Sequence, residues 1–146
     1  MVPTHMTKPN SLRDAEMRRS AYSSVLESGD WLTAAEILQL PGADSFSDGF
    51  EPIMWKSQGD IFTIIEQGTE YYPAFGLQKE IGYRPYNVMS KIIYIFKDYK
   101  DGWGMALWFQ SVNSYLGGKR PQDIMVTDPD LIIKAAFDEI RCVTHG

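Results

Sequence analysis

The chain has 146 residues with 44% apolar and 13% aromatic content, which is enough for one ordinary hydrophobic core and too little for two large independent domains. Its single cysteine, Cys142, excludes an internal disulfide bond and fits a reducing compartment. The net charge of -5 arises mainly in residues 30–80, where nine acidic residues stand against two basic ones. This acidic segment is a poor candidate for binding the phosphates of nucleic acid.

The chain lacks the signals that would send it to a membrane. No apolar run approaches the roughly 20 residues that a membrane-spanning helix needs. Residues 1–10 also lack the apolar core of a secretion signal, so we predict a cytoplasmic protein that does not enter a membrane. We interpret residues 1–10 as a flexible tail or as residues left from an expression vector.

The first predicted helix covers residues 11–28. Ser11 is positioned as its N-cap, with Asp14 three residues later, and Gly29 is positioned to stop it. The apolar face of this helix is thin, so the helix needs a neighbouring surface to pack on. We therefore expect a homodimer or a higher oligomer.

A second helical signal follows at residues 31–38. Thr33 is placed as an N-cap, and Glu36 completes a capping box with it. The segment 42–49 is rich in Gly, Ser and Asp, and it is predicted to be a loop. Residues 50–56 are expected to form a short helix that is broken near Pro52.

A β-hairpin is predicted directly after this region. Residues 60–66 are rich in β-branched and aromatic side chains, residues 67–69 can turn the chain, and residues 70–73 form the second strand. Pro73 ends that strand or leaves it at an edge. The fold class is therefore mainly α, as a helical bundle with a small β-hairpin in the N-terminal lobe.

The remaining pattern is helical. One helix is expected to start at Pro85 and a second to run over residues 103–116, up to the glycine pair that follows it. Residues 121–126 are expected to form a short helical turn, and Thr127 or Asp128 caps a last helix that begins at Pro129. The organisation is a tail (1–10), a lobe resembling a helix-turn-helix with a hairpin (11–80) and a helical domain (81–146).

Residues that could carry chemistry are sparse. The two histidines, His5 and His145, lie at opposite ends of the chain, where neither is placed for catalysis. A paired-carboxylate enzyme would need Glu66 and Glu70 across the hairpin, but solvated hairpin charges are the commoner arrangement. The sequence predicts a protein that is not an enzyme and that has neither a metal site nor a cofactor.

Aromatic density is the unusual feature of the C-terminal half. Trp103, Trp108, Phe109 and Tyr115 fall on one predicted helix, which is apolar nearly all round. Such a helix either lies at the centre of the bundle or is partly covered by a partner. Core packing is favoured for each aromatic residue taken singly, and a contribution to an interface is favoured for the helix as a whole.

A set of these residues resembles a known motif. Trp108, Asn113, Leu116-Gly117-Gly118, Arg120-Pro121, Ile124-Met125 and the helix at 128–140 resemble the tryptophan, the N-x-x-L-G-G-x-x-P-x-x-x-L turn and the terminal helix of the Xre/MbcA/ParS toxin-binding domain. Residues 31–37, 55–56, 59–62 and 72–75 resemble the helix-turn-helix and hairpin lobe that precedes this domain in one subgroup. The resemblance covers about residues 30–141.

The resemblance implies an antitoxin that binds and occludes a RES-type toxin, an enzyme that consumes NAD. The partner-binding residues that it implies, together with the basic and tail residues beside them, are Trp108, Asn113, Leu116, Gly117, Gly118, Lys119, Arg120, Pro121 and Arg141. The alternative is a DNA-binding regulator with the same two lobes. DNA binding is disfavoured because residues 42–55, where a recognition helix would lie, contain no Lys or Arg.

Overall fold

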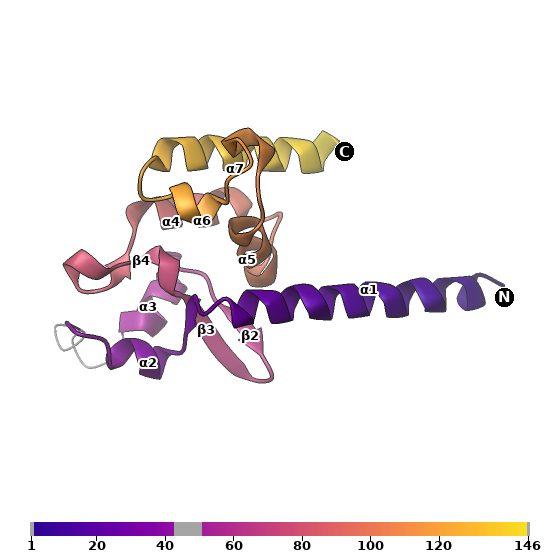
Figure 1. Ribbon diagram of the computed structural model, residues 1–146, viewed down its shortest axis with the longest axis horizontal. Coiled ribbons are helices and arrows are strands. Elements are labelled where there is room, and N and C mark those ends of the chain that lie inside the picture. The colour runs from indigo at the N-terminus through magenta and orange to yellow at the C-terminus, as the bar shows by residue number, and fades with distance from the viewer. Residues whose placement is uncertain (1, 43–50, 146) are drawn as a thin grey trace.

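The computed structural model describes residues 2–42 and 51–145 of the chain. The predicted mainly α class is confirmed, and the helices are joined by small antiparallel sheets (Figure 1). The α-helices are α1 (Val2–Glu27), α2 (Ala34–Leu38), α3 (Glu51–Gln58), α4 (Asn87–Phe96), α5 (Gly102–Gln110), α6 (Pro121–Ile124) and α7 (Pro129–His145). In the C-terminal half, α7 packs over α4 and also contacts α6.

Two small sheets lie in the first two thirds of the chain. The strands β1 (Trp31–Leu32), β2 (Ile64–Glu66) and β3 (Thr69–Pro73) form an antiparallel sheet in the order β1-β3-β2. Gln67 and Gly68 connect β2 to β3 with φ angles of 50° and 79°. Two consecutive positive φ angles are typical of the tightest two-residue connection between antiparallel strands. A second pair joins β4 (Leu77–Gln78) to β5 (Arg84–Pro85).

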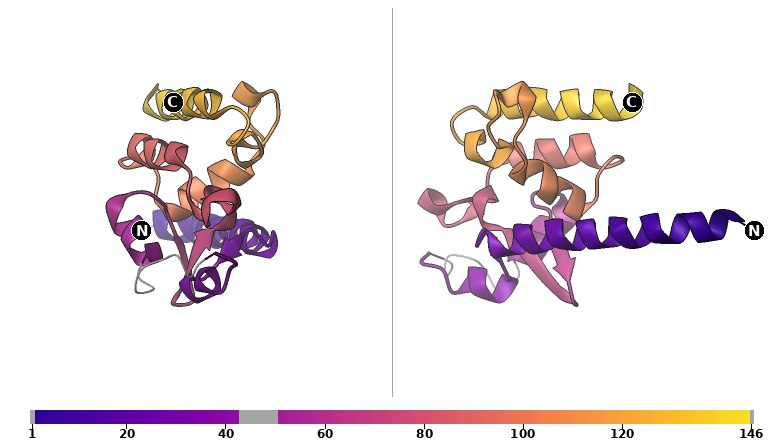
Figure 2. Two further views of the ribbon diagram at one scale, coloured as in Figure 1. Left: turned by 90° about the vertical axis from the view of Figure 1, so that its left-hand side faces the viewer. Right: turned by 45° about the vertical axis from the view of Figure 1, so that its right-hand side comes forward.

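Helix α1 is longer than predicted. It begins at Val2 instead of Ser11, so residues 2–10, expected to be a flexible tail, continue the helix. Pro3 is compatible with this start because the N–H that proline lacks has no partner in the first turn of a helix. Only the C-terminal half of α1 lies against the rest of the protein, and the other half extends away from it (Figures 1 and 2).

The segment around α2 and α3 agrees with the sequence in part. The capping box is confirmed, because Thr33 Oγ1 accepts from the Glu36 N–H and Glu36 accepts from the Thr33 N–H. Trp31 and Leu32, however, form strand β1 and are not part of the helix. Pro52 is the second residue of α3 and does not break it, since a proline in the first turn forfeits no helical hydrogen bond. The predicted loop at 42–49 lies almost wholly outside the described residues.

The C-terminal helices differ from the prediction at two ends. Pro85 lies in β5 and not at a helix start, and α4 begins at Asn87. The helix predicted over 103–116 ends at Gln110, because Ser111 is extended (ψ 144°) and its hydroxyl donates to the Leu107 carbonyl. The short helix α6 is confirmed. So is the cap of the last helix, where the Asp128 carboxylate accepts from the Leu131 N–H.

One hydrophobic core spans the predicted lobe boundary near residue 80. The rings of Phe62, from the N-terminal half, and Phe109, from α5, stack with centroids 5.8 Å apart. Phe75 also lies against Phe109 at 5.1 Å. On another side of α5, Tyr22 of α1 stacks on Trp103 at 3.8 Å. Helix α5 is therefore the central element, as its nearly uniform apolar surface indicated.

Candidate functional site

The predicted partner-binding turn is a closed loop that follows α5. At its base the Asn113 N–H donates to the Lys119 carbonyl (3.0 Å), and the Gly118 N–H donates to the Asn113 carbonyl (2.8 Å). The Asn113 side-chain oxygen accepts from the Tyr115 N–H at 2.9 Å. Gly117 and Gly118 have φ angles of 69° and 85°, a region that strains residues with a Cβ. Asparagine and the two glycines therefore define a rigid turn.

Three of the predicted contact residues are buried and support the turn from below. Trp108 is 6% exposed and Leu116 is 5% exposed, and Pro121 is also buried. The Trp108 ring meets Phe96 edge-on at 4.9 Å and Phe109 at 5.1 Å. These side chains belong to the hydrophobic core, so they are not exposed for contact with another protein.

The exposed part of the turn consists of Gly117, Gly118 and Lys119, while Asn113 is half-buried. Arg120 lies where the turn enters α6. Its guanidinium donates two hydrogen bonds to the Asp123 carboxylate, at 2.7 and 2.9 Å. Hydrogen bonding to Asp123 raises the pKa of Arg120, so the side chain is charged at every physiological pH.

Replacing Arg120 with alanine is expected to change the free energy of unfolding by at most about 0.5 to 1 kcal/mol, because partly exposed ion pairs contribute little. The side chains of the pair are 36% and 51% exposed. If the turn contacts a partner, the same variant should weaken that complex by about 1 kcal/mol or more. Thermal melts and a binding titration, with Arg120→Lys as the charge-retaining control, separate the two effects. A folded alanine variant with unchanged affinity would remove Arg120 from the interface.

Arg141, the last predicted contact residue, lies apart from the turn surface. It is exposed on α7 and pairs with Asp138 at 3.4 Å. The α7 residue that lines a cleft together with Asn113 is Glu139. Side chains two residues apart on a helix point in directions that differ by about 200°. Arg141 therefore points to another side of α7 than Glu139 does.

This cleft, of about 330 Å³, lies where α5, the turn and α7 meet. Its lining residues are Lys100, Gly104, Leu107, Trp108, Ser111, Val112, Asn113 and Glu139. It brings together two residues of the predicted site, Trp108 and Asn113. The Lys100 ammonium and the Glu139 carboxylate close one side with an ion pair at 3.1 Å.

The sequence prediction missed most of the cleft. Lys100, Gly104, Leu107 and Ser111 repeat at intervals of three and four residues, so helical periodicity could have placed them on one face. Glu139 could not have been found in this way, because α7 reaches the cleft only through tertiary packing.

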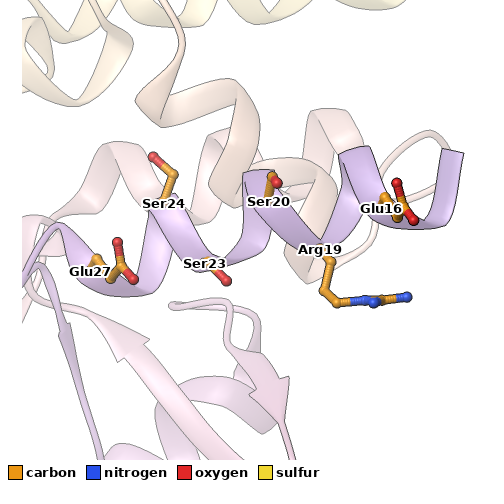
Figure 3. A pocket seen from close by; sticks show the side chains of 6 residues that line it. All are labelled: Glu16, Arg19, Ser20, Ser23, Ser24 and Glu27. Carbon is orange, nitrogen blue, oxygen red and sulfur yellow. The ribbon is translucent and has the colours of Figure 1, made fainter. Parts of the chain in front are cut away.

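A second hollow, of about 410 Å³, lies along α1 (Figure 3). Its lining residues are Glu16, Arg19, Ser20, Ser23, Ser24 and Glu27, all from this one helix. Since no second element encloses it and no residue of the predicted site lines it, this hollow is an open helix surface and is not a binding pocket.

Glu70, one of the two carboxylates that a paired-carboxylate enzyme would use here, forms contacts within the fold. Burial by itself would raise the pKa of Glu70, but hydrogen bonds from Lys56 and Thr63 lower it below its usual value. Glu70 therefore ties β3 to α3 as an ionised side chain. Among residues 12–42 and 51–142, whose side chains the structure describes, no three His, Cys, Asp or Glu side chains lie close enough to share a metal ion.

Within residues 2–42 and 51–145, no helix has both the length and the apolar character needed to cross a bilayer. Comparison with known proteins adds no relative, since no family model, curated protein or solved structure matches this chain.

Proposed function

We propose that the protein is an antitoxin-like binding protein that neutralises a RES-type, NAD-consuming toxin by covering its active site. The observation that carries the proposal is the closed Asn113-to-Lys119 turn, which stands on a buried tryptophan and borders a cleft. The part of the motif that is not buried, Asn113 and Gly117-Gly118, lies in this one turn. Inhibition would be steric, so no residue of this chain needs to react with a substrate.

Apolar side chains at the turn support a role in protein binding. Val112 is 74% exposed and Tyr115 is 42% exposed, and they flank the two sides of Asn113 along the chain. Aromatic and apolar side chains are typical of the centres of protein interfaces. The hydrogen bonds of the turn fix the backbone before binding, so little conformational entropy is lost when a partner docks.

The extended half of α1 supports self-association. Leu12 is 66% exposed and Met17 is 64% exposed on this 26-residue helix. Half of this helix is only about 13 residues long, and a helical segment of that length that packs on no other element is only marginally stable in water. A second copy of the chain, packed along this part of α1 (Figure 2), would supply the missing contacts and give the expected homodimer.

Coexpression with the product of the neighbouring gene tests the proposal. We expect the two proteins to purify as one complex at micromolar concentration, and NAD consumption by the partner to be suppressed in it. Light scattering on this protein alone and on the complex gives both masses. Separate elution of the two proteins would contradict the antitoxin role, and a monomeric mass at all concentrations would contradict the dimer.

A DNA-binding regulator is the second candidate. Arg13, Arg18 and Arg19 are all exposed on α1, outside the acidic segment, and could contact phosphates. A mobility shift on the upstream DNA of the gene distinguishes this function. If the protein binds DNA through phosphates, the binding should weaken steeply as the salt concentration is raised. A complete lack of binding at low salt would reject the DNA-binding function.

A further inference from the structure

Two residues that line the cleft beside the turn have N–H donors that lack an acceptor among the described residues. The Trp108 indole N–H is buried and has no hydrogen-bond partner. The Asn113 amide uses its oxygen to accept from Tyr115, and its NH₂ group donates to no described residue. Both residues line the cleft, but the Trp108 N–H is too buried to reach an occupant, so the Asn113 NH₂ group is the donor that the cleft offers. Buried donors are almost always paired in proteins, so an unpaired one calls for an explanation.

The charges around the cleft also favour an occupant that is a hydrogen-bond acceptor or an anion. Glu139 is the one carboxylate in its lining, and the Lys100 ammonium neutralises it at 3.1 Å. Lys119, joined to Asn113 through the backbone bridge, is exposed and forms no ion pair with any described residue. The one carboxylate in the lining is thus already neutralised, whereas an anionic group held by Asn113 would lie next to the residue that carries the unpaired Lys119 ammonium.

The apolar part of the cleft is formed by Leu107 and Val112, and the position between Lys100 and Leu107 is occupied by Gly104, which has no side chain. Val112 is 74% exposed in the isolated chain. The cleft thus offers an apolar surface next to the Asn113 donor.

We propose that this cleft receives an acidic and apolar segment of the partner protein. The apolar side chain of that segment packs on Leu107 and Val112, and an Asp or Glu carboxylate accepts from the Asn113 amide, near Lys119. This inference rests on the proposed function, because it assigns the part of the toxin that the antitoxin-like surface binds.

Three substitutions at Asn113 and Val112 test the chemistry of the occupant. Asn113→Ser and Asn113→Asp each keep an oxygen that can accept from the Tyr115 N–H, so the turn is retained, but both remove the NH₂ donor. Asn113→Asp also adds a negative charge. Val112→Ser removes part of the apolar surface, and Val126→Ser is its matched control, since Val126 is also exposed (59%) but lines a different cleft, between α4 and α7.

Dissociation constants are measured against the purified product of the neighbouring reading frame, with a melting temperature for each variant. We expect Asn113→Ser to weaken binding about 5-fold or more, as for one lost hydrogen bond to a charged group. Asn113→Asp should weaken it further because the new carboxylate repels that of the partner. Val112→Ser should weaken binding about 3- to 10-fold, as expected for lost apolar contact, while Val126→Ser binds as the wild type does.

The outcomes distinguish the two levels of the proposal. Asn113→Asp binding as tightly as the wild type, or more tightly, would show a donor or cationic occupant and overturn the inference. A wild-type complex that none of the three variants weakens would also overturn it, while leaving the antitoxin role intact. If the wild-type chain forms no complex with this product, the proposed function fails and the inference fails with it.

Discussion

Replacement of Trp108 by alanine is expected to lower the free energy of unfolding by about 3 to 5 kcal/mol, the usual cost of truncating a large buried aromatic side chain. Trp108 is only 6% exposed, and its ring packs against Phe96 and Phe109. It belongs to the same hydrophobic core as Leu116, the residue before Gly117. Urea denaturation followed by circular dichroism measures the loss directly, and binding of the proposed partner should disappear at temperatures where the variant is unfolded.

Two control variants sharpen this test. Tyr94→Ala removes an aromatic side chain that is 71% exposed, so the unfolding free energy should change by no more than about 0.5 kcal/mol. Trp108→Phe keeps a ring in the core and removes an indole N–H that has no partner, so no hydrogen bond is lost. It should cost clearly less than Trp108→Ala. If Trp108→Ala were as stable as Tyr94→Ala, the central position of α5 would be wrong.

The features that sequence predicted well are those with local causes. The capping box at Thr33 and Glu36 involves residues three apart, and the Asp128 cap contacts a backbone N–H three residues later. The Gln67-Gly68 connection likewise needs only two residues that tolerate positive φ. Each of these contacts closes within one turn of chain, so the residues that make it are visible in a short stretch of sequence.

The features that were missed depend on distant partners. Trp31 and Leu32 form a strand only because they pair with Pro73 and Tyr72, about forty residues away. Apart from that pairing, the same residues fit a helix start equally well. The early end of α5 is different, because its cause is local but weak. Ser111 and Asn113 form hydrogen bonds that compete with the helix, a known tendency of short polar side chains that apolar periodicity outweighed in the prediction.

The candidate site likewise has features that the sequence predicted and features that it did not. The motif located the Asn113-to-Pro121 segment, and the structure brings Trp108 and Asn113 to one cleft. The motif does not predict burial, so the predicted contact residues include Trp108, Leu116 and Pro121, which lie in the core. Residues adjacent in sequence can thus differ in role, because a turn needs buried supports as well as an exposed edge.

The contact between α5 and the first sheet depends on a position without a side chain. A Cβ placed on Gly102 would lie 2.0 Å from the Thr63 carbonyl oxygen, just before β2. The next residue, Trp103, donates from its indole N–H to the Ile65 carbonyl at 3.1 Å. The first turn of α5 therefore lies directly on the backbone of the sheet, and this approach joins the two halves of the chain.

Gly102→Ala is accordingly expected to destabilise the protein by about 1 to 3 kcal/mol or more, because the rigid carbonyl of Thr63 cannot move aside as a side chain could. Helix propensity alone predicts the opposite sign, a gain of up to about 1 kcal/mol. Gly104→Ala is the matched control in the same helix. Its new Cβ would meet Lys100 Cβ at 3.1 Å and the Asp101 carboxylate at 3.3 Å, contacts that shifts of a few tenths of an ångström relieve, so its unfolding free energy should stay within about 1 kcal/mol of the wild type. Urea denaturation of both variants decides between the two effects. If Gly102→Ala were as stable as Gly104→Ala, the close packing of α5 on β2 would be refuted.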